Sequence, residues 1–272
     1  MIPVSITSDY ITDAQPAGPF LRNIAQTGFS HVHWCHDWNS EVLYSSEDIR
    51  RFGGWLREYG LSLLDLHASA GINSHWGAGS DDQRSAGVEL VKNRIITASA
   101  LSSDTIILHI PERPPTLPAD RFMERLKKSL DELGPFARKH GVRIALENMI
   151  GDTFEHLHAL FPAYGPDFIG LCYDSGHGNI GGRGLDFLES VKDRLIAVHL
   201  HDNVGSWDEH LLPFSGTVDW QRLARIIGTS SYSKCQNLEV GVRGHPELTE
   251  EEFLRKALDI GIRLDGMIRS VQ

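Results

Sequence analysis

The sequence contains few cysteines and no long apolar run. Three cysteines occur among 272 residues, at Cys35, Cys172 and Cys235. Because they are odd in number and far apart, they indicate reduced core thiols rather than a disulfide framework. No stretch approaches the roughly 18 consecutive apolar residues of a membrane-spanning helix. The amino terminus has no basic segment before an apolar run, so we expect no targeting signal, no membrane partner and a cytoplasmic location.

Positive charge is also scarce. The chain carries 26 Lys and Arg against 36 Asp and Glu, a formal net charge of −10 at pH 7. Nucleic-acid binding draws most of its affinity from Lys and Arg that neutralise phosphates, so an acidic chain without a basic run is poorly suited to it. The content of 41% hydrophobic and 23% charged residues is typical of a globular protein and excludes a disordered chain. These features favour an enzyme that acts on a small molecule.

Short apolar runs alternate with longer amphipathic stretches along the chain. Some of these runs, such as residues 105–108, are continuously apolar or nearly so, as expected for strands covered on both faces. Eight runs predict strands, which are Val4–Thr7, Phe29–Trp34, Ser62–Leu66, Thr105–Ile110, Arg143–Glu147, Ile169–Tyr173, Ile196–Leu200 and Asn237–Val240.

Amphipathic helices are predicted between these strands, most clearly over Glu47–Tyr59, Asp120–His140 and Thr249–Ile260. Thr249 and Glu252 have the spacing of a capping box. Glycines stand where a helix would end and the next strand begin, at Gly28, Gly60, Gly141 and Gly165.

Strands that alternate with helices predict a parallel sheet with right-handed crossovers. Eight such units of about 34 residues most naturally close into a (β/α)₈ barrel, the TIM barrel. We therefore expect one domain over residues 1–272. An open doubly wound sheet is the alternative, but no Gly-x-Gly-x-x-Gly turn follows the first predicted strand.

Six consecutive predicted strands, the third to the eighth, end at or beside a His, Asp or Glu. In a TIM barrel these strand ends converge on one mouth, where active sites are built. Any one such residue is more often a hydrogen-bonded core residue or a helix cap, but six at equivalent positions favour a metal site. Carboxylates and imidazoles without thiolate suit Zn²⁺, Mn²⁺, Co²⁺ or Fe²⁺ better than a soft metal. The six residues are His67, His109, Glu147, Asp174, His199 and Glu239.

Other polar and aromatic residues are less specific. Four tryptophans fall in or beside predicted mouth loops, where they would stack on a sugar or pack half-buried. Trp34 among them is expected to bind substrate, and so is Arg243 among three loop arginines that could meet a phosphate or a carboxylate. The other tryptophans are Trp38, Trp76 and Trp207, and the other arginines are Arg113 and Arg183. Seven histidines are expected to be structural or solvent-facing, namely His31, His33, His36, His75, His140, His156 and His158.

Several segments resemble the xylose-isomerase-like barrel superfamily, which includes sugar (phosphate) isomerases and epimerases and endonuclease IV. They are Leu146-Glu147-Asn148, Asp174-Ser175-Gly176-His177, His199-Leu200-His201-Asp202, Asp208-Glu209-His210 and Leu238-Glu239. The resemblance covers nearly the whole chain and implies a metal site formed by Glu147, Asp174, His199 and Glu239. In the ketose 3-epimerase branch, the residues that match Glu147 and Glu239 are both ligands and the acid/base pair. The residue that matches His177 binds substrate there.

Endonuclease IV, by the same resemblance, adds five ligands to form a three-zinc cluster, matched here by His67, His109, His177, Asp208 and His210. A trinuclear zinc phosphodiesterase is therefore the alternative function. The negative net charge disfavours this endonuclease function, because it is unsuited to a DNA-binding groove. Segment 67–73 disfavours it too, because it has small residues where the endonuclease pattern has a bulky aromatic residue that distorts DNA. Against a close ketose epimerase, Gly205 stands where that family carries an arginine. Segment 199–220 is most similar to the sugar phosphate isomerase/epimerase group.

We therefore predict a divalent-metal-dependent sugar or sugar-phosphate isomerase or epimerase. Glu147 and Glu239 would abstract and return a proton next to a carbonyl, and a bound Zn²⁺, Mn²⁺ or Co²⁺ would stabilise the enediolate. His177 would orient a substrate oxygen, or hold a second metal with Asp208 and His210. No organic cofactor is expected. A homo-oligomer through the apolar segment 211–214 and a non-catalytic, sugar-sensing barrel are left open.

Overall fold

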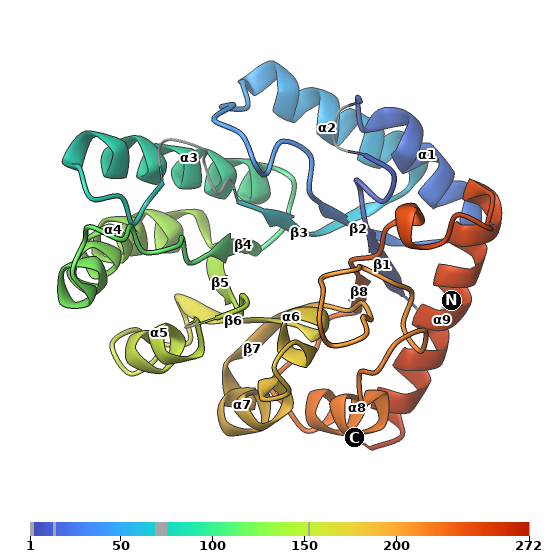
Figure 1. Ribbon diagram of the computed structural model, residues 1–272. Coiled ribbons are helices and arrows are strands. Elements are labelled where there is room, and N and C mark those ends of the chain that lie inside the picture. The colour runs from blue at the N-terminus through green and yellow to red at the C-terminus, as the bar shows by residue number, and fades with distance from the viewer. Residues whose placement is uncertain (1–2, 13–14, 69–74, 152, 272) are drawn as a thin grey trace.

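Eight short parallel strands form the centre of the molecule and helices surround them (Figure 1). The structure is a computed structural model that describes residues 3–12, 15–68, 75–151 and 153–271. The strands are β1 (Val4–Thr7), β2 (His31–Trp34), β3 (Ser62–His67), β4 (Thr105–His109), β5 (Arg143–Glu147), β6 (Ile169–Asp174), β7 (Leu195–His199) and β8 (Gln236–Leu238). They lie within one or two residues of the predicted bounds.

The sheet closes on itself. Hydrogen-bonded neighbours run in the order β7-β6-β5-β4-β3-β2-β1-β8, and all pairs are parallel. A parallel bridge between Leu200 and Leu238 joins β7 to β8. Here the Leu200 amide donates to the Asn237 carbonyl at 3.0 Å, and the Glu239 amide donates to the Leu200 carbonyl at 3.3 Å. This closure confirms the TIM barrel and excludes the open doubly wound sheet.

Most of the longer helices cover the outside of the barrel with an apolar stripe. Leu126, Leu130 and Leu133 of α4 are fully buried, and burying one such side chain contributes about 1.5–3 kcal/mol. The helices are α1 (Gly18–Thr27), α2 (Ser46–Tyr59), α3 (Asp81–Ala100), α4 (Ala119–His140), α5 (Thr153–Leu160), α6 (Ser175–Asn179), α7 (Gly184–Val191), α8 (Trp220–Gly228) and α9 (Glu250–Arg269), with the 3₁₀ turns η1 (Lys192–Arg194) and η2 (Val242–Gly244). None of the described helices is long and apolar enough to cross a membrane.

Helix ends follow the predicted chemistry with two exceptions. The predicted C-caps at positions 28, 60 and 141 are left-handed glycines with φ of 114°, 70° and 67°. Gly165 is not such a cap, because α5 already ends at Leu160. The predicted capping box at Thr249 is present, but α9 runs past Ile260 to Arg269. Its glycine at position 261 marks a close approach to Val4 of β1 rather than a helix end.

Alternate residues of each strand point into the barrel. Its floor is a small apolar cluster of Ile107, Ala145, Cys172, Ile196 and Ala197. The next inward positions on the same strands are occupied by His109, Glu147, Asp174 and His199, so the polar layer lies directly above the apolar one. All three cysteines are buried and form no disulfide, as predicted.

Gly87→Ala should destabilise the fold. A Cβ at Gly87 of α3 would overlap the backbone of His75 and Trp76, and overpacking of this kind costs about 1–3 kcal/mol. Gly266→Ala is the matched control, because a Cβ added at that helical glycine would meet no atom within 4 Å outside its own helix, and alanine there should stabilise α9 by about 0.5–1 kcal/mol. Urea unfolding measures both, and equal stability of the two variants would contradict the packing described.

Candidate metal centre

Four strand ends bring carboxylate and imidazole side chains together in a concave site at the mouth of the barrel, which we call the bowl. Each of Glu147, Asp174, His199 and Glu239 offers a ligand atom, and these atoms all lie within 4.8 Å of one another. Strand register brings this about, since Asp174 of β6 pairs with His199 of β7. A cation held at about 2.0–2.2 Å from each oxygen or nitrogen separates opposite ligands by roughly this distance. The donor set therefore fits one divalent cation.

Several atoms in the bowl lack hydrogen bonds. His199 Nδ1 lies 2.9 Å from Glu239 Oε2 and 3.3 Å from Glu147 Oε2. Even so, both nitrogens of His199 and Oε2 of Glu147 are buried with no hydrogen-bond partner among the described residues. Buried polar atoms in this state cost about 1–3 kcal/mol each unless another group satisfies them. Coordination of one cation would satisfy His199 Nδ1 and Glu147 Oε2, which supports the fit.

The carboxylates of the bowl are held in their ionised form. Burial by itself would raise the pKa of Glu147, but the charges of His199 and His109 overcome it and lower that pKa well below the usual range. Burial opposes ionisation of Glu239 too, and His199 again lowers the pKa well below normal. Both side chains therefore carry the charge that a metal ligand needs.

His201, which was not predicted as a site residue, supports Asp174. It is fully buried, and its Nε2 donates to the two Asp174 oxygens at 3.1 and 3.0 Å. The backbone amide of His177 donates to the same carboxylate at 2.7 Å. Residues two apart in an extended segment face the same side, so the spacing of His199 and His201 could have predicted that His201 also faces the site.

Asn148 was missed as well. Its Nδ2 donates to the Asp174 carbonyl at 3.0 Å, while the Asp174 amide donates to its Oδ1 at 2.8 Å. This pair of hydrogen bonds joins Asn148, which follows β5, to the last residue of β6.

A second group of donors shares Glu147. His67 Nε2 lies 3.0 Å from His109 Nε2, and His109 Nε2 lies 3.2 Å from Glu147 Oε2. His67 Nδ1 donates to the Ala68 carbonyl at 2.9 Å, so its Nε2 lone pair faces the group. Burial and the neighbouring His109 lower the pKa of His67 to about 3, which keeps the imidazole neutral. These three residues also meet the 4.8 Å condition.

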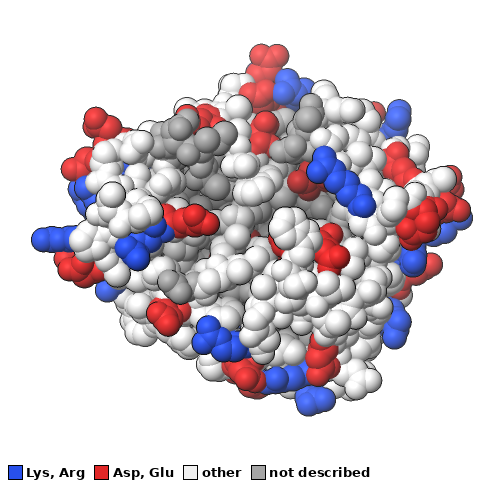
Figure 2. Space-filling view, viewed as in Figure 1, with Lys and Arg blue, Asp and Glu red and all other residues white. Residues whose placement is uncertain are grey.

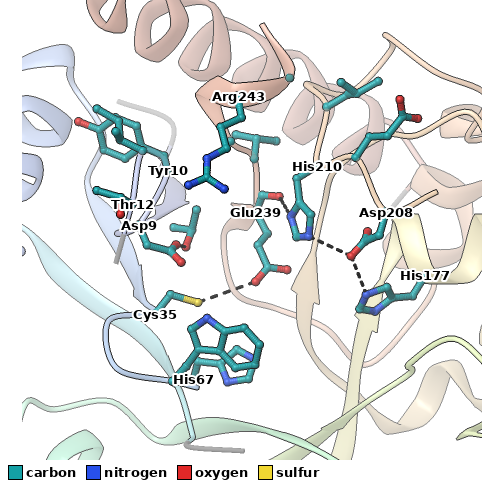
Figure 3. Close-up of a pocket in the computed structure, with 18 of the residues that line it drawn as sticks. Asp9, Tyr10, Thr12, Cys35, His67, His177, Asp208, His210, Glu239 and Arg243 are labelled. Atoms are coloured by element: carbon teal, nitrogen blue, oxygen red, sulfur yellow. Dashed lines mark hydrogen bonds and ion pairs between the residues drawn. The ribbon is translucent and has the colours of Figure 1, made fainter. Parts of the chain in front are cut away.

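The third predicted group is centred on Asp208 (Figure 3). Asp208 Oδ2 lies 3.3 Å from His177 Nε2 and 3.2 Å from His210 Nε2. The opposite nitrogens donate to carbonyls, His177 Nδ1 to Asn148 at 3.0 Å and His210 Nδ1 to Glu239 at 2.8 Å. Burial would lower the pKa of His210, but Asp208 and Glu239 raise it to about 10. The structure thus brings all nine predicted metal-binding residues together.

A cavity of about 740 Å³ opens above these groups. Trp38 lines it with its ring 5.0 Å from that of His67, and Trp207 lines it while 71% exposed. Arg243 projects into the cavity from η2, on the side of Glu239 and Asp9 (Figure 3).

The substrate-binding prediction for Trp34 is wrong. This side chain is buried outside the barrel, where its Nε1 donates to the Tyr44 hydroxyl at 3.1 Å and its ring packs on Phe52. The reason is strand alternation in β2, since His33 points inward and Trp34 therefore points toward α2. Trp76 is a core residue too, and its Nε1 donates to the His109 carbonyl at 2.9 Å.

Two loop arginines, the apolar segment 211–214 and segment 67–73 are the remaining features singled out in the sequence. Arg113 donates to the Leu117 carbonyl of its own loop at 2.7 Å, and Arg183 precedes α7; neither lines the cavity. The apolar segment 211–214 packs on its own chain, with Leu212 fully buried and Phe214 under the Arg263 guanidinium. In segment 67–73, positions 69–73 lie outside the described residues.

Comparison with known proteins assigns the family. The model of the xylose isomerase-like TIM barrel family matches residues 21–259, so the chain belongs to that family. Protein y4fM of Sinorhizobium fredii is 33% identical over 279 residues, which cover 93% of this chain and 89% of the relative. An inosose isomerase of Halalkalibacterium halodurans is 26% identical over 148 residues, covering 50% of this chain and 52% of the relative.

Solved structures agree on the fold. A D-tagatose 3-epimerase-like protein superposes with a TM-score of 0.78 at 20% identity, covering 99% of this chain and 98% of the other. A D-psicose 3-epimerase superposes with a TM-score of 0.79 at 15% identity, covering 98% of this chain and 99% of the other. Similarity at these identities establishes the barrel architecture.

His201→Ala should weaken metal binding by about 10–100-fold, because Asp174 loses the donor that orients its carboxylate. His158→Ala, which alters an exposed histidine of α5, is the control and should bind as the unsubstituted protein does. Calorimetric titration of metal-free protein with Mn²⁺ or Co²⁺ measures the effect. Unchanged affinity in folded His201→Ala protein would show that His201 does not orient Asp174 for metal binding.

Proposed function

We propose that this protein is a divalent-metal-dependent sugar isomerase or epimerase that moves a proton at a carbon next to a carbonyl. The observation that carries the proposal is that two ionised carboxylates, Glu147 and Glu239, reach one cavity while both contact His199. The family supports it, as do the relatives and neighbours named for isomerisation or epimerisation of sugars.

Glu147, Asp174, His199 and Glu239 would hold the catalytic cation. When bound, Zn²⁺, Mn²⁺ or Co²⁺ supplies Lewis-acid polarisation of the substrate carbonyl and its adjacent hydroxyl. The groups around His67 and Asp208 offer room for further cations, or for substrate oxygens in their place.

Glu147 and Glu239 would be the acid/base pair. One carboxylate accepts the carbon-bound proton, and the other delivers a proton on the opposite side or at the neighbouring position. Because Glu147 is 1% exposed, bulk water is kept from the proton that it carries. Positioned acid–base catalysis of this kind contributes about 10²–10⁴-fold in rate. His177, whose Nε2 faces the cavity beside Asp208, would orient a substrate oxygen.

The cavity favours an uncharged sugar over a sugar phosphate. Asp9 and Glu209 line it in addition to the proposed metal-binding carboxylates, and Arg243 is the one Lys or Arg among the described lining residues. A phosphate dianion near Asp9 or Glu209 would be repelled by a carboxylate that is not among the proposed metal ligands. Arg243 would donate to hydroxyl oxygens at the end of the sugar away from Glu147, and Trp38 would pack on its apolar face.

Phosphodiester hydrolysis by a three-zinc cluster is less favoured, although its nine matching residues come together. DNA binding needs Lys and Arg along the path of the phosphates. On the face that carries the cavity, the Lys and Arg of the described residues lie mainly toward the periphery (Figure 2). Incubation with abasic-site DNA tests this alternative, and cleavage would replace the sugar assignment.

Glu147→Gln and Glu239→Gln should each lower kcat by about 10²–10⁴-fold, because an amide cannot accept the proton. Glu189→Gln, an exposed change on α7, is the control and should leave kcat unaltered. The assay is a screen of ketoses and inososes with Mn²⁺, Co²⁺ or Zn²⁺, with metal analysis of the purified protein and circular dichroism of each variant. Near-normal turnover in either site variant would refute the acid/base assignment.

Arg243→Gln should raise KM for the best uncharged substrate by about tenfold or more while kcat changes little. A hydrogen bond from a charged donor is worth about 1.5–3 kcal/mol, and Arg243 is proposed to act away from the reacting carbons. Arg183→Gln is the control outside the cavity. The phosphorylated form of the same sugar should have a lower kcat/KM than the uncharged form, and the opposite order would refute the proposed substrate class.

A further inference from the structure

A row of buried polar side chains lies beside the proposed metal centre. Asp65 Oδ1 is 2.6 Å from His33 Nδ1, and His33 Nε2 is 3.2 Å from Cys35 Sγ. The exposed fractions of Asp65, His33 and Cys35 are 1%, 0% and 2%. Two neighbouring strands supply the row, since His33 and Cys35 are alternate residues at the end of β2 and Asp65 belongs to β3.

The row determines which nitrogen of His33 is free. Nδ1 carries the proton and donates it to Asp65, because a carboxylate can only accept. Nε2 is then left with a lone pair that points at the Cys35 sulfur. A carboxylate that orients an imidazole through its far nitrogen is the usual arrangement behind a metal-binding histidine.

Glu239 completes a donor set with these residues. Cys35 Sγ lies 3.9 Å from Glu239 Oε1 (Figure 3), while the other oxygen, Oε2, faces His199. The ligand atoms of His33, Cys35 and Glu239 are within 4.8 Å of one another. Cys35 and Glu239 also line the cavity, which provides an entry path and room for water as a further ligand.

We propose that His33 Nε2, Cys35 Sγ and Glu239 Oε1 form an additional cation site that binds a thiophilic divalent ion such as Zn²⁺, Co²⁺ or Cd²⁺. The sulfur–metal bond forms as the thiol proton leaves to solvent, and Glu239 bridges the two sites through its two oxygens. One thiolate, one imidazole and one carboxylate suit these ions better than Mg²⁺ or Mn²⁺.

The surroundings of Cys35 argue against a nucleophilic role. Burial, together with the charges of Asp9 and Glu239, raises the pKa of its thiol well above the usual range. A protonated thiol is a poor nucleophile, whereas a bound cation deprotonates a coordinating thiol outright. The site shares Glu239 with the proposed catalytic centre but does not depend on any sugar chemistry.

Cobalt absorption tests the site directly. Titration of metal-free protein with Co²⁺ should produce a sulfur-to-cobalt charge-transfer band in the near ultraviolet, with weaker visible bands from both sites. The ultraviolet band should disappear in Cys35→Ser and remain in the double variant Cys172→Ala/Cys235→Ala, where Cys35 is the one remaining thiol. Cys172 is the critical comparison, because its ligand atom groups with those of Glu147 and His199.

Asp65→Asn tests the orienting carboxylate. Cobalt affinity read at the ultraviolet band should fall by about 10–100-fold. Asp104→Asn, which alters an aspartate paired with Arg143 and Lys234, is the control and should leave the affinity unchanged.

The outcomes separate this site from the proposed function. The proposal is overturned if the ultraviolet band persists in Cys35→Ser, if the double variant loses it, or if saturating Co²⁺ gives visible bands without it. In the last case the carboxylate–imidazole centre stands while the thiolate site fails. A Cys35-dependent band in a protein that converts no sugar would support this site and count against the sugar assignment.

Discussion

Buried negative charge at the carboxyl end of the barrel is the constraint on which the rest of the site depends. Glu147 and Asp174 are 1% and 0% exposed, and burying an ionised carboxylate costs several kcal/mol unless it is paired. The imidazoles around these carboxylates offset part of that cost, and a bound cation would offset the rest. The parallel barrel makes this possible, because its strands all end at the same rim and bring side chains distant in sequence within contact distance.

Neighbouring groups then hold the carboxylates in place. His201 donates to both oxygens of Asp174, and Asn148 joins the backbones of β5 and β6. Gly176 allows His201 to approach, since a Cβ at that position would overlap the imidazole. Side chains held in this way would need little rearrangement to bind a cation, and such preorganisation increases affinity.

Strand β2 shows how the inward and outward alternation of side chains determines which residues can reach the site. Its inward positions, His33 and Cys35, face the bowl, whereas the intervening Trp34 packs against α2. The prediction that Trp34 contacts substrate failed for this reason, because a tryptophan near a strand end fits either side equally well. The same alternation brings a thiol to a site whose strand-end residues had indicated only oxygen and nitrogen ligands.

The barrel and the positions of the polar strand ends could be predicted from residue patterns alone. Both depend on local periodicity: apolar runs, helix caps, and a His, Asp or Glu where each run stops. Helix α9 shows the limit of local patterns, since the predicted helix stops at Ile260 whereas α9 continues through Gly261, which packs closely on Val4. Three relations became visible in the folded chain: His201 supports Asp174, Asp65 orients His33 toward Cys35, and Arg243 faces the cavity while Arg113 and Arg183 do not. These relations join residues on different strands and loops, and strand register, inward alternation and barrel closure determine them together.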